Sequence, residues 1–306
     1  MKYLFFLIFS LNIIFYICLV YKPLNIESDF SIEEGNNLNE IFINLERKKI
    51  YFPKTLKLIF NVSGTDKKIY LGKYKIDNND SLIDIFKKIY FGKIVLKKFI
   101  IGEGSKITDL FSKEIIDSYC QTMNFLNGCE LEGFAKPDVY FYDRESELLS
   151  ILKKSIDKQM IDLNKSWQER KSKLNNFSKV EILIIASILE KESCANEREK
   201  VSGVIYNRLV NNMLLQMDST TIYGLKNFNG NLKKKDLKDS SLYNTYMHKG
   251  LPPGPISNPS KNSIFAAAKP EEHDYLYFVA KDKCSHEFST NYDDHLKAVK
   301  KYQLRQ

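Results

Sequence analysis

The sequence lacks the motifs that identify several common classes of enzyme. It contains no GxSxG segment, no glycine-rich phosphate loop and no HExxH segment, which mark α/β-hydrolase nucleophiles, nucleotide phosphate sites and zinc peptidases, respectively. Its four histidines have no spacing suited to a metal ion, so we expect His286 and His295 to be neutral surface or hydrogen-bonding residues. Neither a metal site nor another cofactor is therefore expected.

Cysteine is scarce, with five residues in the chain. Cys18 lies in an apolar segment, and Cys120, Cys129, Cys194 and Cys284 show no CxxC spacing. This spacing indicates neither a zinc site nor a disulfide framework. A bridge between Cys120 and Cys129 is conceivable in an oxidising compartment, but free thiols are the expectation.

The sequence also lacks a basic helix of the kind that reads nucleic acid. The formal net charge is +8, yet the lysines alternate with acidic and polar residues, apart from short runs such as Lys233–Lys235. Such scattering argues against nucleic acid and leaves an anionic membrane surface or an anionic polymer as a partner. No internal repeat is visible, and a hydrophobic content of 43% in 306 residues suits one or two globular domains.

An apolar run near the N-terminus covers residues 3–21 and is interrupted only by Ser10 and Asn12. A run of this length can cross a bilayer. The residues that follow it, beginning at Lys22, lack the small-residue pattern of a signal-peptide cleavage site. We therefore predict an uncleaved transmembrane helix, with a short cytoplasmic tip, within residues 1–24.

Residues 25–104 have the sequence patterns of short helices and short strands. The patterns predict helices and strands at these positions: a helix near 38–48, strands around 56–62, 69–76 and 94–101, and a helix over 81–92 capped by Ser81. We expect a small α+β module.

Residues 105–306 are predicted to be mainly helical with a few strands. Helices are expected over most of 106–175, except for an aromatic loop at 133–142, and again at 178–192 and 196–212. A polar loop, a proline- and glycine-rich turn and a final strand and helix follow. The fold class is therefore predicted as α+β, with domains at 1–24, 25–104 and 105–306.

The helix predicted from Ser178 ends in two carboxylates, Glu190 and Glu192. Ser178 and Glu181 form a capping box, and the residues between Glu181 and Glu190 are apolar on nearly every face, which predicts a buried helix. A carboxyl group at the end of such a helix loses solvent and lies near the negative end of the helix dipole. It therefore tends to stay protonated, as a general acid must.

Glu190 and Glu192 cannot face the same cavity, because two residues along a helix correspond to a rotation of about 200°. One is therefore a candidate catalyst and the other a structural residue. Alternatively, both are solvated residues at the end of a core helix. Arg198 could pair with Glu190 or Glu197, as in an ordinary salt bridge at a helix start.

Two later segments, LLQMDSTTIYG and SLYNTYMHKGLPPGPISNP, combine amide, hydroxyl and aromatic side chains. This mixture binds sugars through hydrogen bonds and ring stacking. The stiff turn at 250–259 could line a cleft. The ordinary alternative is a pair of polar loops that cover a core. Beside a buried helix with a terminal carboxylate, the segments predict a saccharide cleft.

Together these segments resemble the YceG-like family. The resemblance covers essentially the whole chain and is carried by ASILEKES, EREKVSGVIYNRL, LLQMDSTTIYG, LYNTYMHKGLPPGPISNP, IFAAAKP, YLYFVA and HEFSTNYDDH. Through GKYKI and SLIDIFKKIYFG, residues 25–104 resemble the LysM-like module of that family. By the same resemblance, residues 105–306 correspond to its lysozyme- or transglycosylase-like catalytic domain.

The resemblance implies an endolytic lytic transglycosylase of peptidoglycan. Such a lyase cleaves the β-1,4 bond between N-acetylmuramic acid and N-acetylglucosamine and leaves 1,6-anhydro ends. It implies that Glu192 is the catalytic acid and base. It further implies a substrate cleft that includes Gln216, Asp218, Thr220, Tyr243, Asn244 and Tyr246.

The resemblance also implies a location and partners. It suggests a single-pass protein of the inner membrane with its catalytic part in the periplasm, and partners among cell-wall synthesis proteins such as penicillin-binding proteins. The chain departs from the family's usual residues at Met217, Ser219, Leu242 and Ala135-Lys136, which bears on substrate positioning. Two other functions stay open: a hydrolytic muramidase with Asp218 as its second carboxylate, and a catalytically silent wall-binding scaffold.

Overall fold

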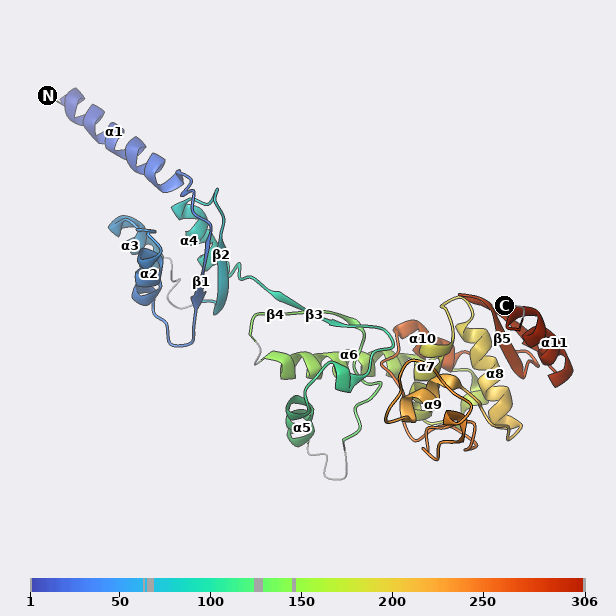
Figure 1. Cartoon of the computed structure of the whole chain (residues 1–306). Coiled ribbons are helices and arrows are strands. Elements are labelled where there is room, and N and C mark those ends of the chain that lie inside the picture. The colour runs from blue at the N-terminus through green and yellow to red at the C-terminus, as the bar shows by residue number, and fades with distance from the viewer. Residues whose placement is uncertain (1, 63, 65–68, 124–128, 145–146, 305–306) are drawn as a thin grey trace. The chain divides into compact units, whose positions relative to one another are not determined.

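A computed structural model describes residues 2–62, 64, 69–123, 129–144 and 147–304, without the side chains of residues 2–9 and 12. Its helices and short sheets confirm the predicted α+β class (Figure 1). The chain divides into two compact units, residues 1–98 with 141–147 and residues 99–140 with 148–306.

The first unit contains a two-stranded antiparallel sheet and helices, of which α2 contacts β1 and α4 contacts β2. Its elements are α1 (Lys2–Tyr21), β1 (Ser28–Ile32), α2 (Leu38–Arg47), α3 (Lys54–Val62), β2 (Gly72–Ile76) and α4 (Leu82–Tyr90). Phe30 pairs with Tyr74 across the sheet, and their rings stack at 5.1 Å. Alternate residues of both strands are buried, as the period of a half-buried strand requires. Ser81 caps α4 through a capping box, as predicted.

The strand predicted around residues 56–62 is wrong, because this segment forms the helix α3. Its buried residues, Leu56 and Phe60, are four positions apart, while Leu58 and Ile59 between them are exposed. That spacing fits one face of a helix and not the alternation of a strand. An apolar run this short does not distinguish the two by composition.

The predicted transmembrane anchor at residues 3–21 falls within α1, and several of its side chains lie outside the described part. Among the residues that the structure describes, no helix is both long enough and apolar enough to cross a membrane. The anchor therefore lacks structural support.

The second unit is mainly helical. Its elements are η2 (Ile107–Asp109), α5 (Lys113–Thr122), α6 (Leu148–Gln168), η4 (Ser172–Leu174), α7 (Lys179–Glu192), α8 (Arg198–Val210), α9 (Asp218–Gly224), η5 (Asp236–Lys238), α10 (Lys261–Ala268), β5 (Tyr277–Asp282), β6 (Ser285–Ser289) and α11 (Tyr292–Tyr302). The unit boundaries fall within β3 (Lys97–Ile101) and β4 (Asp138–Tyr142), which pair in a two-stranded sheet. Part of the loop predicted at 133–142 is therefore a strand.

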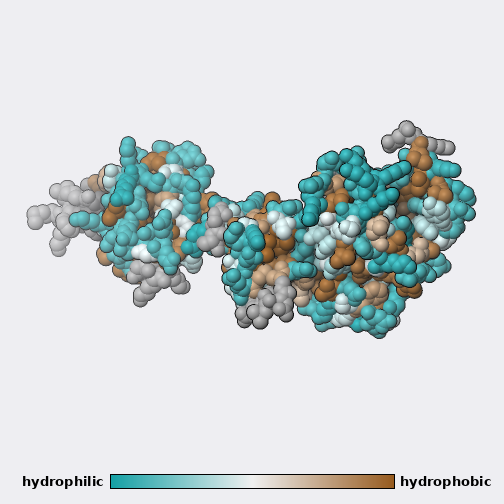
Figure 2. Space-filling view, turned by 60° about the horizontal axis from the view of Figure 1, so that its bottom comes forward, coloured by the Kyte–Doolittle hydropathy of each residue, from teal (hydrophilic) through white to brown (hydrophobic). Residues whose placement is uncertain are grey.

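The core of the second unit forms around α7. Residues 182–189 are all buried, and α7 contacts α6, α8, α9 and α10. The solvent-facing surface in Figure 2 is mostly hydrophilic, with apolar residues interspersed. A helix that is apolar on every face needs such surrounding helices, and its polar end is left at their edge.

Candidate active site

The helix α7 begins with the predicted capping box. The Ser178 hydroxyl accepts a hydrogen bond from the Glu181 backbone N–H (3.2 Å), and the Glu181 carboxylate accepts one from the Ser178 N–H (2.7 Å). The helix ends at Glu192, fourteen residues long. Both carboxylates therefore lie in its last turn, and their surroundings differ completely.

Glu190 is the structural carboxylate. Its side chain is only 4% exposed and lies 2.7 Å from the Arg198 guanidinium. Oε2 of Glu190 accepts hydrogen bonds from the Ser260 N–H (2.8 Å), the Ser260 hydroxyl (2.6 Å) and the Ser263 hydroxyl (2.7 Å). Of the two pairings considered for Arg198, the structure has the one with Glu190. These contacts join the end of α7 to the start of α8 and to the N-cap of α10.

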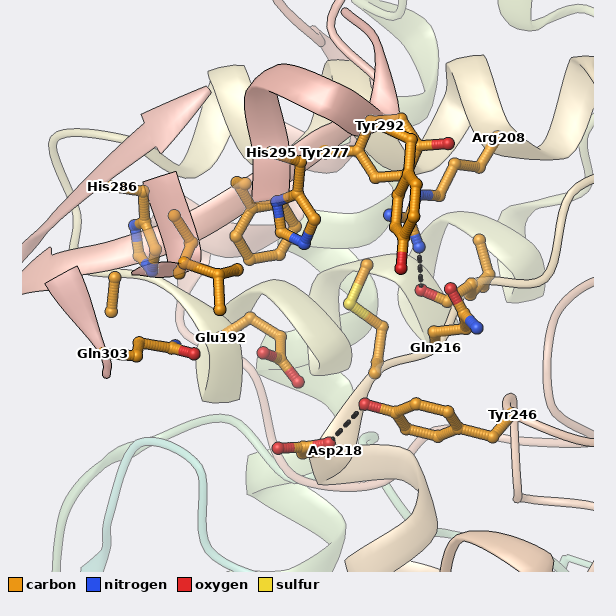
Figure 3. Close-up of a pocket in the computed structure, with 16 residues that line it drawn as sticks. Glu192, Arg208, Gln216, Asp218, Tyr246, Tyr277, His286, Tyr292, His295 and Gln303 are labelled. Carbon is orange, nitrogen blue, oxygen red and sulfur yellow. Dashed lines mark hydrogen bonds between the residues drawn. The ribbon is translucent and has the colours of Figure 1, made fainter. Parts of the chain in front are cut away.

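Glu192 faces a cavity of about 520 Å³ on the other side of the helix. The lining comes from α7, α8, α9, the segment before α9, the β5–β6 hairpin and α11 (Figure 3). The described lining residues are Glu192, Arg208, Leu215, Gln216, Met217, Asp218, Tyr246, Tyr277, Phe278, Val279, Ala280, His286, Tyr292, His295, Val299 and Gln303. The separation of Glu190 from Glu192 around the helix thus matches the expectation that they cannot share a cavity.

Burial raises the pKa of Glu192 above its ordinary value. Two hydrogen bonds act in the opposite direction, because the Ser219 hydroxyl (2.5 Å) and the Ser219 backbone N–H (3.3 Å) both donate to Oε1 of Glu192. The nearby Asp218 carboxylate raises the pKa further, and His286 lowers it. With Oε1 accepting both hydrogen bonds, Oε2 is the oxygen left to carry a proton into the cavity.

Three of the predicted cleft residues line the cavity. They are Gln216, Asp218 and Tyr246. The Tyr246 hydroxyl donates to Oδ1 of Asp218 at 2.6 Å (Figure 3). Gln216 has a positive φ of 49°, which is uncommon for a residue other than glycine and is often found where a backbone is held for function.

The other three predicted cleft residues are not among the described residues that line the cavity. The Thr220 hydroxyl is fully buried and bonds to the Met217 carbonyl and the Thr245 hydroxyl. Asn244 is also fully buried, and its amide organises the loop before it. Tyr243 packs on Tyr223, with ring centroids 4.7 Å apart. Nothing in the structure places these three side chains on the cavity surface.

The turn at 250–259 does not line this cavity either. Residues 254–260 are buried and bind the middle of α7: the Ile256 N–H donates to the Ser187 hydroxyl (3.0 Å), and the Ser257 hydroxyl donates to the Ser187 carbonyl (3.1 Å). The segment supports the helix that carries Glu192.

Several residues at the cavity were not predicted from the sequence as cleft residues. Ser219, Arg208, Tyr277, His286, Tyr292, His295 and Gln303 lie at or beside the cavity. Most of them belong to the C-terminal hairpin and helix, which the motif HEFSTNYDDH partly covers. That motif indicates that the segment is shared with the family, but it does not indicate which of its side chains face the cavity.

His286 is held by a second carboxylate. Nδ1 of His286 lies 2.7 Å from Oε2 of Glu197, and both side chains are mostly buried. The His286 backbone N–H also donates to Glu197, at 3.3 Å. This agrees with the expectation of a hydrogen-bonding histidine. Within the described residues, no group of three or more histidine, cysteine, aspartate or glutamate side chains could hold a metal ion.

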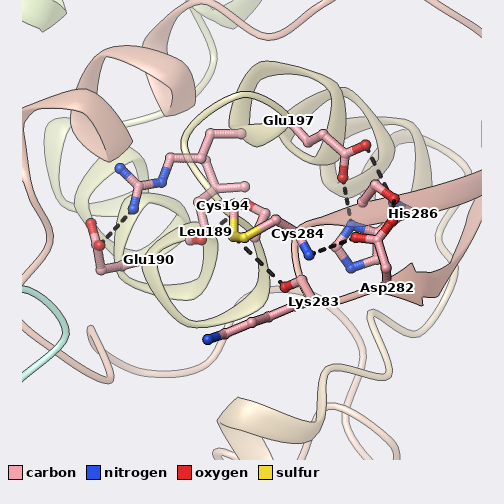
Figure 4. The surroundings of a disulfide bond; sticks show 11 residues. Leu189, Glu190, Cys194, Glu197, Asp282, Lys283, Cys284 and His286 are labelled. Carbon is pink, nitrogen blue, oxygen red and sulfur yellow. Dashed lines mark hydrogen bonds and ion pairs between the residues drawn. A yellow bond between two sulfur atoms is a disulfide. The ribbon is translucent and has the colours of Figure 1, made fainter.

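The expectation of free thiols is wrong for four cysteines. Cys120 bonds to Cys129, and Cys194 bonds to Cys284, 90 residues later. The second disulfide joins the segment after α7 to the turn of the β5–β6 hairpin, between Glu190 and the Glu197–His286 pair (Figure 4). The Cys120–Cys129 bridge is the alternative that the sequence left open, whereas nothing in the sequence indicates the second bridge, because only the fold brings residues 194 and 284 together.

Curated relatives match part of the chain. An endolytic murein transglycosylase of Bacillus subtilis (strain 168) is 38% identical over 174 residues, which cover 56% of this chain and 48% of the relative. An endolytic murein transglycosylase of Streptococcus pneumoniae is 33% identical over 156 residues, covering 49% of this chain and 28% of the relative. The chain thus spans about half the length, or less, of these relatives.

A solved structure and a family description match most of the chain. The crystal structure of a yceG-like protein from Listeria monocytogenes has a TM-score of 0.59 and 27% identity, covering 89% of this chain and 98% of that one. Residues 30–301 match the YceG-like family, which is the family that the sequence motifs resemble. This chain belongs to the YceG-like family.

Proposed function

We propose that this protein is an endolytic lytic transglycosylase that cleaves the β-1,4 bond between N-acetylmuramic acid and N-acetylglucosamine in peptidoglycan strands. The observation that carries the proposal is Glu192, a carboxyl group with a raised pKa at the wall of a cavity large enough to be a glycan site. The names of the curated relatives point to the same reaction.

Glu192 acts first as the acid. Its Oε2 proton passes to the glycosidic oxygen as the bond from that oxygen to C1 of the muramyl residue breaks. The 6-hydroxyl of the same muramyl residue then forms a new bond to C1, and its proton returns to the ionised Glu192. The products are a 1,6-anhydro end and a free 4-hydroxyl, and no water is consumed.

One carboxyl group is sufficient for this sequence, whereas hydrolytic glycosidases usually need two. The internal hydroxyl replaces the water that a second carboxylate would activate. Effective concentrations of well-oriented internal nucleophiles reach ~10⁵ M or more, so ring closure can outrun hydrolysis. The two Ser219 hydrogen bonds suit a group that must be ionised between the two proton transfers.

A hydrolytic muramidase is the second candidate. Asp218 supports it, because this carboxylate lines the same cavity as Glu192. Asp218 already accepts a hydrogen bond from Tyr246, which occupies one of its oxygens. Hydrolysis would leave reducing ends in place of anhydro ends, and a catalytically silent scaffold would leave the glycan intact.

The test is digestion of peptidoglycan by the purified full chain, with the products read by mass spectrometry. We expect 1,6-anhydro-muramyl ends from the native protein and a loss of about 10²- to 10⁴-fold in rate for Glu192→Gln, the usual effect of removing a general acid. Glu192→Gln should melt no lower than the native protein, because the amide removes a carboxyl group whose ionisation is disfavoured by burial. Reducing ends, or an active Glu192→Gln variant, would contradict the proposal.

We also propose that the N-terminal apolar run anchors the protein in the inner membrane, with the second unit in the periplasm beside the wall synthesis proteins. The proposal rests on residues 3–21, a run of sufficient length to span a bilayer. An anchored protein stays in the membrane pellet at 35.7 kDa after alkaline carbonate extraction. Release into the supernatant would count against the anchor.

A further inference from the structure

The C-terminal side of the cavity carries three aromatic side chains that form a continuous surface. We call Tyr277, Tyr292 and His295 the aromatic wall. The Tyr277 and His295 rings stack at 5.2 Å and 25°, and the Tyr292 ring lies 5.8 Å from Tyr277. Tyr292 is 56% exposed, so its ring has area to offer to a ligand. In Figure 3 these side chains lie across from Asp218 and Tyr246, with Glu192 between the two groups.

One atom of the aromatic wall has no hydrogen-bond partner. Nδ1 of His295 is buried, and no described group binds it. Burial, followed by the nearby Arg208 charge, lowers the pKa of His295 from its ordinary value, which favours the neutral ring. A buried ring nitrogen without a partner costs free energy that a ligand hydroxyl could recover.

The charges around the aromatic wall argue against an anionic ligand at this position. Among the described residues that line the cavity, Arg208 is the sole arginine or lysine. Its Nε and Nη1 already donate to the carbonyl oxygens of Leu276, Leu214 and Leu215, and its guanidinium lies over the Tyr277 ring at 5.1 Å. A peptide-stem carboxylate would therefore find few unused donors. A pyranose, with an apolar face and neutral hydroxyls, fits the surface better.

We propose that the aromatic wall is the subsite for the N-acetylhexosamine residue next to the bond positioned over Glu192, stacking that sugar on the exposed Tyr292 ring, which Tyr277 supports from behind, and binding a hydroxyl at His295. The inference rests on the proposed glycan substrate. It adds a sugar-binding surface from β5 and α11 to the cleft residues Gln216, Asp218 and Tyr246 on the opposite side.

The test measures binding of a peptide-free tetrasaccharide of alternating N-acetylglucosamine and N-acetylmuramic acid by calorimetry. The protein is the full chain carrying Glu192→Gln, so that no turnover occurs. Tyr292→Ala should raise the Kd about tenfold, which corresponds to about 1.4 kcal/mol. His295→Phe keeps a ring in the stack and removes only the nitrogen, so it should raise the Kd by about fivefold, within the range of one hydrogen bond.

A matched control lies on the same helix. Tyr302 borders a different hollow, near Glu287, so Tyr302→Ala should leave the Kd within a factor of about two. If Tyr292→Ala and His295→Phe both bind like the parent, or if the parent does not bind the tetrasaccharide, the aromatic wall is not the subsite. Cleavage of peptidoglycan by the native chain is measured separately. The subsite proposal can therefore be contradicted while the proposed function is supported. In the native background, Tyr292→Ala should raise KM and change kcat little.

Discussion

Two glutamates that are two residues apart illustrate how surroundings decide the role of a side chain. Glu190 is enclosed by one guanidinium and three donors from two serines, which tie it to the starts of α8 and α10. Glu192 has two hydrogen bonds to a single oxygen, and burial is the largest influence on its pKa. The same residue type is therefore tied to neighbouring helices at one position and faces a cavity with a raised pKa at the other.

Ser219→Ala should move the alkaline limb of kcat/KM to higher pH. The Ser219 hydroxyl donates to the Glu192 carboxylate and so favours its ionised form, which lowers the Glu192 pKa. Removing the hydroxyl raises that pKa further, and the protonated acid then persists to higher pH. The measurement is a pH profile of kcat/KM.

Ser219→Thr provides the control for this prediction, because threonine keeps the hydroxyl donor. The alkaline limb of its kcat/KM profile should lie at the same pH as that of the native protein. A limb that moves to lower pH in Ser219→Ala, or that does not move, would mean that Ser219 does not stabilise the ionised form of Glu192.

At the scale of elements, the end of α7 is joined to α8 and α10 through one carboxylate. Glu190→Gln should lower the free energy of unfolding by about 3 kcal/mol, because the buried Arg198 charge loses its partner. Urea unfolding followed by circular dichroism measures this. Cleavage activity under folding conditions should fall far less than in Glu192→Gln.

The control is an ion pair of similar length at the surface. Lys269 and Glu169 lie 2.7 Å apart, and each side chain is 39% exposed. Glu169→Gln should therefore cost far less stability than Glu190→Gln. If Glu190→Gln and Glu169→Gln lower the free energy of unfolding equally, Glu190 does not have the structural role assigned to it.

Local patterns sufficed to predict some elements and not others. The capping boxes at Ser178 and Ser81 use neighbours three residues away, so the sequence predicts α7 and α4 directly. The sequence predicts a strand where the structure has the helix α3. Packing against the rest of the unit decides which apolar residues of this short run are buried, and the run itself does not show this. Local sequence patterns indicate which secondary structures a segment can form, and tertiary packing decides between helix and strand when both fit the pattern.

The candidate site also could be predicted only in part from local sequence patterns. Glu192 and half of the predicted cleft could be inferred from motifs, since they belong to contiguous segments. Thr220 and Asn244 carry sugar-binding chemistry in the sequence but use it on their own backbone and neighbours. The aromatic wall comes from residues about 100 positions after Glu192, and only the folded chain brings the two together.

At the scale of the whole molecule, the two compact units differ in what they contain. The cavity, Glu192 and both disulfides lie in the second unit. The first unit has its own core around Phe30, Tyr74 and the phenylalanines of α2, α3 and α4. All the residues of the candidate site therefore belong to the second unit.

The Cys194–Cys284 bond closes a covalent ring of chain that includes α8, α9, α10 and β5. A cut within the ring does not separate the two resulting pieces. An exposed part of the ring is the lysine run Lys233–Lys235. A site-specific protease sequence inserted there should yield one band without reductant and two with it, and the nicked protein should keep its cleavage activity.

The same insertion in a Cys194→Ser, Cys284→Ser variant should yield two bands under both conditions. Two bands from the native cysteines without reductant would show that the ring is open. If the ring is closed, the chain can be cut at the exposed lysine run while Glu192 and the aromatic wall are still held on one covalent frame.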